Sequence, residues 1–153
     1  MKKIKHIGSY GLIIKDNKIV LIKKVGGPYD GKLDLPGGTI ELNETPQQAL
    51  IRELKEEVGI KVTDYELFDG NSVTIDWIYK GEKQLVHHIG FFYRIINYEN
   101  MISKNINIDD VNDDSMGAEF YDINKLYKEE LSDIAILEIE KLGYKIKHKK
   151  EIL

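Results

Sequence analysis

Three glutamates in one short segment have the side chains and the spacing of a cation site. Glu53, Glu56 and Glu57 lie at positions i, i+3 and i+4, so a helix would carry their carboxylates on one face. Carboxylates that crowd together repel one another, and a hard divalent cation relieves that repulsion. All-oxygen ligands of this kind suit Mg²⁺ or Mn²⁺. The spacing therefore predicts a metal site on a helix.

A rare arginine precedes the first of these glutamates. Arg52 and Arg94 are the only arginines in a chain that is rich in lysine. A guanidinium group can hold one or two carboxylates in a fixed orientation, which a lysine does poorly. We expect Arg52 to bind Glu56, one helical turn on, and Glu44 in the preceding loop. The competing interpretation is a solvated helix with ordinary i,i+4 ion pairs.

The flanking residues predict where this helix begins and ends. Thr45 can serve as the N-cap, Pro46 suits the first helical position, and Gln48 completes a capping box. Gly59 can supply the left-handed residue just past the last turn. We therefore expect a helix from Pro46 to Val58. Such well-defined ends favour the metal site over the solvated helix.

The segment from Gly38 to Ile60 also fits a longer pattern, G-x5-E-x7-R-E-U-x-E-E-x-G-U, where U is a bulky aliphatic residue. The fixed positions are all filled, by Gly38, Glu44, Arg52, Glu53, Leu54, Glu56, Glu57, Gly59 and Ile60. This is the Nudix box, and the chain resembles the Nudix (MutT-related) hydrolases. The resemblance implies a metal-dependent enzyme that cleaves a diphosphate linkage in a nucleoside diphosphate joined to another group.

The resemblance also implies a set of metal ligands. Glu56 and Glu57 would hold Mg²⁺ or Mn²⁺ together with the backbone carbonyl of Gly37, and Glu53 would be a further ligand or the base that activates water. In some relatives an acidic residue outside the box adds to this site. The sequence does not single out which one would do so here among Asp109, Asp110, Asp113, Asp114 and Glu119.

We take Glu53, Arg52 and Glu44 as the catalytic residues of this hypothesis, with Arg52 orienting the carboxylates. In similar enzymes a basic residue just before the glycine-rich loop meets the substrate phosphate. Lys23 and Lys24 occupy that place here and are the predicted substrate-binding residues. The alternative is that both are ordinary charges on an edge strand.

The order of the predicted elements agrees with this resemblance. Asp16-Asn17 is a two-residue hairpin signal between the apolar runs 9–15 and 18–25. Further strands are expected at 65–68, 73–79, 84–96 and 119–121, and a second helix from an N-cap at Ser132 to just before Gly143. The pattern resembles the Nudix α/β/α sandwich, an α/β fold with a mixed sheet and a catalytic loop-helix-loop. We expect one domain, residues 1–153.

Composition limits the partners. The chain has no cysteine and a net charge of −4, so we expect neither a disulfide framework nor a nucleic-acid polymer as partner. No apolar run approaches the length of a membrane span, and the N-terminus lacks a signal-peptide core. These features predict a cytoplasmic protein with a small-molecule nucleotide substrate and no membrane partner. A homodimer stays open.

The substrate is predicted by elimination among similar enzymes. Those that act on ADP-ribose tend to carry a proline after the box, whereas the prolines here are Pro28, Pro36 and Pro46. The coenzyme A and NADH signatures are also missing. A (deoxy)nucleoside triphosphate, cleaved to the monophosphate and pyrophosphate, therefore leads. The alternatives are sugar nucleotides, dinucleoside polyphosphates, and a non-catalytic module that senses a nucleotide.

Overall fold

A computed structural model describes residues 1–100, 102 and 115–149. The strands are β1 (Lys2–Leu12), β2 (Ile14–Lys15), β3 (Lys18–Lys24), β4 (Leu33–Asp34), β5 (Gly37–Thr39), β6 (Lys61–Tyr79), β7 (Glu82–Glu99) and β8 (Ser115–Asp122). The helices are α1 (Pro46–Val58) and α2 (Asp133–Lys141), with short 3₁₀ turns η1 (Ile123–Lys125) and η2 (Lys128–Glu130). No helix within the described residues is long and apolar enough to cross a membrane.

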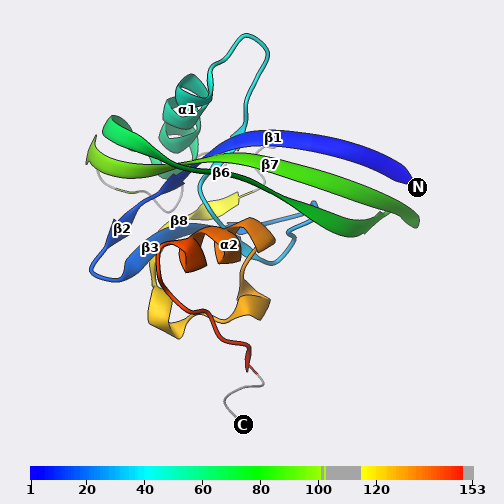
Figure 1. Ribbon diagram of the computed structural model, residues 1–153. Helices are drawn as coiled ribbons and strands as arrows, with labels where there is room; N and C mark the ends of the chain where they lie inside the picture. The colour runs from blue at the N-terminus through cyan, green and yellow to red at the C-terminus, as the bar shows by residue number, and fades with distance from the viewer. Residues whose placement is uncertain (101, 103–114, 150–153) are drawn as a thin grey trace.

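The strands form two sheets of four strands each. The first has the order β5-β1-β7-β6 and is mixed, because β1 runs parallel to β7 while the other neighbours are antiparallel. The second contains β2, β3 and β4, with β8 also paired to β3. Helix α1 lies on one side of the long strands and α2 on the other (Figure 1). The predicted α/β/α sandwich is confirmed, with its strands divided between two sheets.

Helix α1 has the predicted ends. The Thr45 hydroxyl accepts a hydrogen bond from the Gln48 amide at 3.1 Å, and the Gln48 side chain accepts one from the Thr45 amide at 2.9 Å. Gly59 adopts a left-handed conformation with φ of 81°. Leu50 and Leu54 are fully buried against the first sheet. Local capping therefore fixes the length of the helix, and burial of one face fixes its rotation.

The long hairpin β6–β7 differs from the prediction. The segments 65–68 and 73–79 were expected as separate strands, but β6 is continuous and pairs with β7 along its whole length. Register shifts between Val62 and Tyr65 and between Leu67 and Asp69 absorb the extra residues as bulges. Lys80 and Gly81 close the hairpin with φ of 50° and 79°. The ladder with β7 thus overrides the turn-like sequence around Gly70.

A buried carboxyl group joins α2 to β6. Glu138 is fully buried, and neither of its carboxyl oxygens has a hydrogen-bond donor among the described residues. Its neighbour is the Asp69 carboxylate, which pairs with Lys141 at 2.5 Å. Burial, and then Asp69, raise the pKa of Glu138 to about 8. Burial and the neighbouring Asp69 carboxylate therefore keep Glu138 mostly protonated at neutral pH.

This pair predicts a loss of stability at alkaline pH. The pKa of Glu138 is about 8 in the folded state and roughly 4.3 in an unfolded chain, so the folded state binds the extra proton between these values. The stabilisation that this proton gives to the folded state is complete below pH 4 and is lost as the pH rises through 8. We expect Glu138→Gln to raise the melting temperature by roughly 3–6 °C at pH 9 relative to the wild type. Thermal unfolding at pH 5 and pH 9 checks this, and an equal difference at both values would contradict it.

Candidate active site

Arg52 is the centre of the candidate site. Its Nε donates a hydrogen bond to Oε2 of Glu44 at 2.7 Å, and its Nη2 donates one to Oε1 of Glu44 at 2.9 Å. Nη1 donates to Glu53 at 2.9 Å and to Glu56 at 3.4 Å, and Nη2 donates to the Thr39 carbonyl at 3.0 Å. A guanidinium has five N–H donors, and these bonds employ all of them. The structure thus brings Arg52 to Glu44 and Glu56 as predicted, and adds two acceptors that were not predicted.

The carboxylates around Arg52 differ in acidity. Hydrogen bonds from Arg52, and then from the Glu41 amide, lower the pKa of Glu44 to about 2. Burial raises the pKa of Glu53, as does the nearby Glu56, while Arg52 opposes them. Glu44 is therefore a permanently charged partner of the guanidinium, whereas Glu53 takes up a proton more readily.

The glycine-rich loop brings the backbone close to two carboxylates. Glu57 is buried, and its Oε1 accepts a hydrogen bond from the Gly37 amide at 2.8 Å. A Cβ atom at Gly37, whose φ is 142°, would lie 2.1 Å from the Ser9 carbonyl oxygen. A Cβ atom at Gly38 would lie 2.7 Å from the Cδ of Glu53. Gly37 therefore has to be glycine because the loop passes so close to the β1 backbone, whereas a side chain at Gly38 would displace the Glu53 carboxylate.

The predicted metal ligands Glu53, Glu56 and Glu57 are chemically suited to a cation, and each also accepts a hydrogen bond from another group of the protein. Among the described residues, no three histidine, aspartate or glutamate side chains converge as a ready-made metal cage. Arg52 binds Glu53 and Glu56, and the Gly37 amide binds Glu57. A carboxylate has two oxygens and about four acceptor positions, so one such bond does not exhaust it. These hard oxygen donors fit Mg²⁺ or Mn²⁺.

A cavity of about 100 Å³ adjoins this cluster, and Lys24 lies between the two. Lys24 lines the cavity and acts electrostatically on both Glu53 and His88, lowering the pKa of each. Lys23 is exposed and lies at a register shift between Ile22 and Lys24. Of the two predicted substrate-binding lysines, Lys24 lines the cavity, and Lys23 is not among the lining residues.

Two tyrosines hold a buried histidine in the wall of this cavity. The Tyr10 hydroxyl lies 2.5 Å from Nε2 of His88, and the Tyr29 hydroxyl lies 2.9 Å from its Nδ1. Burial, with smaller effects of His6 and Lys24, lowers the pKa of His88 to about 3. The ring is therefore neutral and has one donor and one acceptor nitrogen, so one tyrosine donates and the other accepts.

A buried aspartate connects the cavity with α2. Asp34 lines the cavity, and its Oδ1 accepts hydrogen bonds from the Ser132 hydroxyl at 2.6 Å and from the Leu35 amide at 2.8 Å. Ser132 is the N-cap of α2, as predicted, and its hydroxyl accepts from the Ala135 amide. The sequence did not reveal the role of Asp34, because its partner is distant in the chain and a lone aspartate carries no motif.

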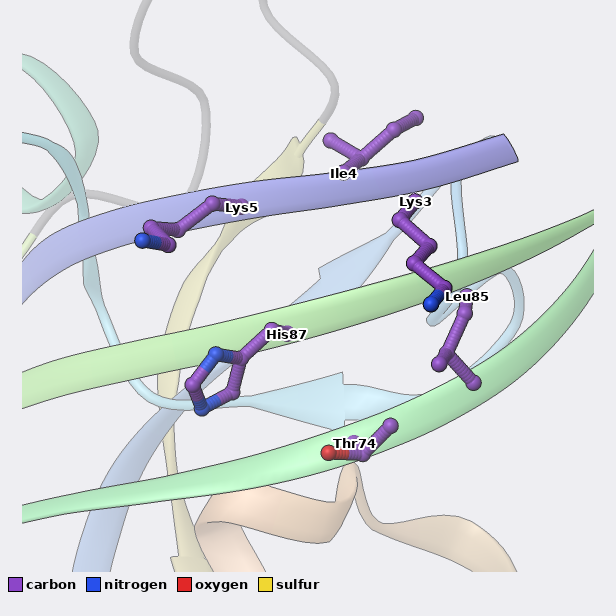
Figure 2. A pocket seen from close by; sticks show the side chains of 6 residues that line it. All are labelled: Lys3, Ile4, Lys5, Thr74, Leu85 and His87. Carbon is purple, nitrogen blue, oxygen red and sulfur yellow. The ribbon is translucent and has the colours of Figure 1, made fainter.

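A wider hollow of about 370 Å³ lies on the opposite face of the first sheet. Figure 2 shows the side chains that line it, from Lys3, Ile4, Lys5, Thr74, Leu85 and His87. His87 and His88 are successive residues of β7, so their rings lie on opposite faces of the sheet. None of the lining residues is a carboxylate, which sets this hollow apart from the candidate active site.

The structure does not identify an acidic residue outside the box that completes the site. Asp109, Asp110, Asp113 and Asp114 lie outside the described residues. Glu119 lies on β8 opposite Leu21. Burial, and then a hydrogen bond with Glu119, raise the pKa of the Tyr121 phenol to about 12.

The chain is similar in sequence to curated proteins. The chain is 36% identical over 118 residues to the ADP-ribose pyrophosphatase of Methanocaldococcus jannaschii, covering 77% of this chain and 62% of that protein. It is 42% identical over 69 residues to the 8-oxo-dGTP diphosphatase of Proteus vulgaris, covering 44% of this chain and 62% of that protein. The chain thus spans less than two thirds of the length of these curated relatives.

Solved structures share the fold. The MutT NUDIX hydrolase of Burkholderia pseudomallei matches 91% of this chain and 98% of its own, with a TM-score of 0.63 and 23% identity. A MutT protein of Bacillus halodurans matches 94% of this chain and 85% of its own, with a TM-score of 0.67 and 17% identity. The family model of the NUDIX domain matches residues 5–141. Because that match spans most of the chain and contains Arg52, its carboxylates and the glycine-rich loop, the protein belongs to the NUDIX domain family.

Proposed function

We propose that this protein hydrolyses the diphosphate linkage of a nucleoside diphosphate joined to another group, with Mg²⁺ or Mn²⁺ as cofactor. The observation that carries the proposal is the arginine that holds Glu44, Glu53 and Glu56 beside the buried pair of Glu57 and Gly37. The relatives support it, because they are named ADP-ribose pyrophosphatase and 8-oxo-dGTP diphosphatase.

Each group of the site has a role in this proposal. Glu56, Glu57, Glu53 and the Gly37 carbonyl would hold the cation, which when bound supplies positive charge to the phosphate oxygens. Glu53 is also placed to take a proton from the attacking water, because burial and Glu56 raise its pKa above the ordinary value. Arg52 keeps the carboxylates oriented, and Lys24 offers a positive charge to the phosphate next to the cavity.

The proposed substrate is a (deoxy)nucleoside triphosphate, cleaved to the monophosphate and pyrophosphate. The 8-oxo-dGTP diphosphatase of Proteus vulgaris supports it, because that protein is 42% identical to this chain over 69 residues, against 36% over 118 residues for the M. jannaschii relative. ADP-ribose is a second candidate despite the missing proline, because the M. jannaschii relative matches a larger share of this chain. A nucleotide sensor is disfavoured, since the carboxylates and their arginine are all in place.

A hydrolysis screen tests the proposal. The purified chain is incubated with nucleoside triphosphates, 8-oxo-dGTP, ADP-ribose, sugar nucleotides and dinucleoside polyphosphates, each with Mg²⁺ and with excess chelator. We expect turnover only with the metal, and from a triphosphate the monophosphate and pyrophosphate, identified by phosphorus NMR in ¹⁸O-labelled water. Full turnover in chelator would contradict the metal requirement, and diphosphate plus orthophosphate would contradict the cleavage site. Tight binding without turnover across the panel would favour the sensor.

A further inference from the structure

His6 lies where the cavity and the carboxylate cluster meet. Its ring stacks on His88 with 4.6 Å between the ring centres and 14° between the planes, and it lines the cavity. Its Nε2 lies 2.8 Å from the hydroxyl of Thr39, in a hydrogen bond that connects β1 to the end of β5. One imidazole thus contacts both the cavity and the strand that leads to Arg52.

Thr39 connects His6 to the arginine. Its hydroxyl bonds His6, and its carbonyl oxygen accepts from Arg52 Nη2 at 3.0 Å. The other hydrogen bonds of Arg52 go to carboxylate side chains, which can rotate. The carbonyl belongs to the backbone of β5, where Thr39 pairs with Gly8. Thr39 is therefore the backbone acceptor that helps to orient the guanidinium, and a displacement of Thr39 reorients the group that holds Glu53 and Glu56.

The support behind His6 is rigid. His88 is 2% exposed, and both of its ring nitrogens are bonded to tyrosines. A planar group that enters the cavity and contacts His6 cannot displace it toward His88. Contact with such a group therefore acts on His6 and on its hydrogen bond to the Thr39 hydroxyl.

We propose that His6 is a positioning residue that couples the cavity to the catalytic carboxylates. A heteroaromatic ring bound in the cavity shifts His6, then Thr39, and through its carbonyl the guanidinium of Arg52. This inference rests on the proposed function in taking the ring to be the base of the nucleotide. Occupancy of the cavity then raises kcat, because the carboxylates reach their working orientation only when the ring is bound.

The arginine content of the chain makes this coupling observable. Arg52 and Arg94 are the only arginines, so a ¹⁵N-labelled sample has two side-chain Nε–H signals, which Arg94→Lys assigns. Adenosine, guanosine, cytidine and uridine at millimolar concentration, in chelator, supply a ring without a phosphate. Any change at Arg52 therefore cannot come from phosphate contact with the cluster. We expect at least one nucleoside to shift the Arg52 signal and leave the Arg94 signal in place.

Two variants test the path. Thr39→Val removes the hydroxyl but keeps the carbonyl, and His6→Phe keeps a stacking ring but removes the hydrogen bond. We expect each to reduce the nucleoside-induced Arg52 shift by about fivefold or more, while the affinity by calorimetry changes by less than about threefold. His87→Ala is the matched control on the opposite face of β7 and should keep the full shift. A full shift in Thr39→Val, or no Arg52 response to any nucleoside in the wild type, would overturn the inference.

Kinetics give an independent readout. With a nucleotide that the wild type hydrolyses, Thr39→Val and His6→Phe should lower kcat by roughly three- to tenfold, with KM within about twofold. A raised KM with unchanged kcat would make His6 a binding residue only and would overturn the coupling. The NMR experiment needs neither metal nor turnover. A negative hydrolysis screen would therefore contradict the proposed function but not the coupling. An Arg52 signal that responds to no nucleoside would contradict the coupling but not the proposed function.

Discussion

Replacing Glu57 by glutamine should lower kcat on the confirmed substrate by about 10²-fold or more. Glu57 is buried, and its Oε1 accepts from the Gly37 amide at 2.8 Å. A glutamine can make the same hydrogen bond through its amide oxygen, so the loop and helix stay together. What disappears is the negative charge, and with it a ligand that we propose for the cation. Steady-state kinetics over a range of Mg²⁺ concentrations measure the loss.

Glu66→Gln is the matched control for this substitution. Glu66 is an exposed residue of β6 outside the box, and the change removes the same charge from the protein. It should leave kcat within about twofold of the wild type. If Glu57→Gln also kept the wild-type kcat at every Mg²⁺ concentration, the proposed metal site would be in the wrong place.

Replacing Arg52 by lysine should lower kcat by roughly tenfold or more. Arg52 uses all its donors, in bonds to Glu44, Glu53, Glu56 and the Thr39 carbonyl. A lysine keeps the positive charge but has three donors on one nitrogen. It cannot bridge Glu44 and Glu53 in one plane, so the carboxylates lose their common orientation. Kinetics of the purified variant measure the effect, and circular dichroism verifies that α1 is intact.

Arg94→Lys provides the comparison, since Arg94 is the other arginine of the chain and is exposed on β7. There the side chain packs over the Phe68 ring. This variant should retain the wild-type kcat. An equal kcat for Arg52→Lys and the wild type would place Arg52 among ordinary surface ion pairs, whose loss costs little.

The parts of the fold that the sequence predicted well depend on local signals. The bounds of α1 follow from Thr45, Gln48 and Gly59, which all lie within one turn of its ends. The pairing of Arg52 with Glu44 was predictable because helix geometry and opposite charge act over eight residues. The continuity of β6 was not, because the residues around Gly70 have turn-like propensities. Pairing with β7 outweighs those propensities in the folded chain.

The cavity beside the carboxylates depends on distant contacts. His6 meets His88 because β1 runs parallel to β7, and no local pattern predicts which strands become neighbours. Thr39 was not predicted as a partner of Arg52, because the contact uses its backbone carbonyl, which every residue has. The sequence motif was therefore enough to predict the positions of the carboxylates, whereas the residues of the cavity beside them could be identified only from the three-dimensional structure.

The bond between Asp34 and Ser132 has a consequence for synthesis on the ribosome. The two residues are 98 positions apart, and one lines the cavity while the other caps α2. A nascent chain that has not yet reached residue 132 already contains every carboxylate, the arginine and both glycines of the cluster. It lacks the hydroxyl that fixes Asp34 in the cavity wall. The residues of the catalytic end are therefore synthesised before the pocket wall can be completed, and the appearance of Ser132 at the start of α2 is the step that completes it.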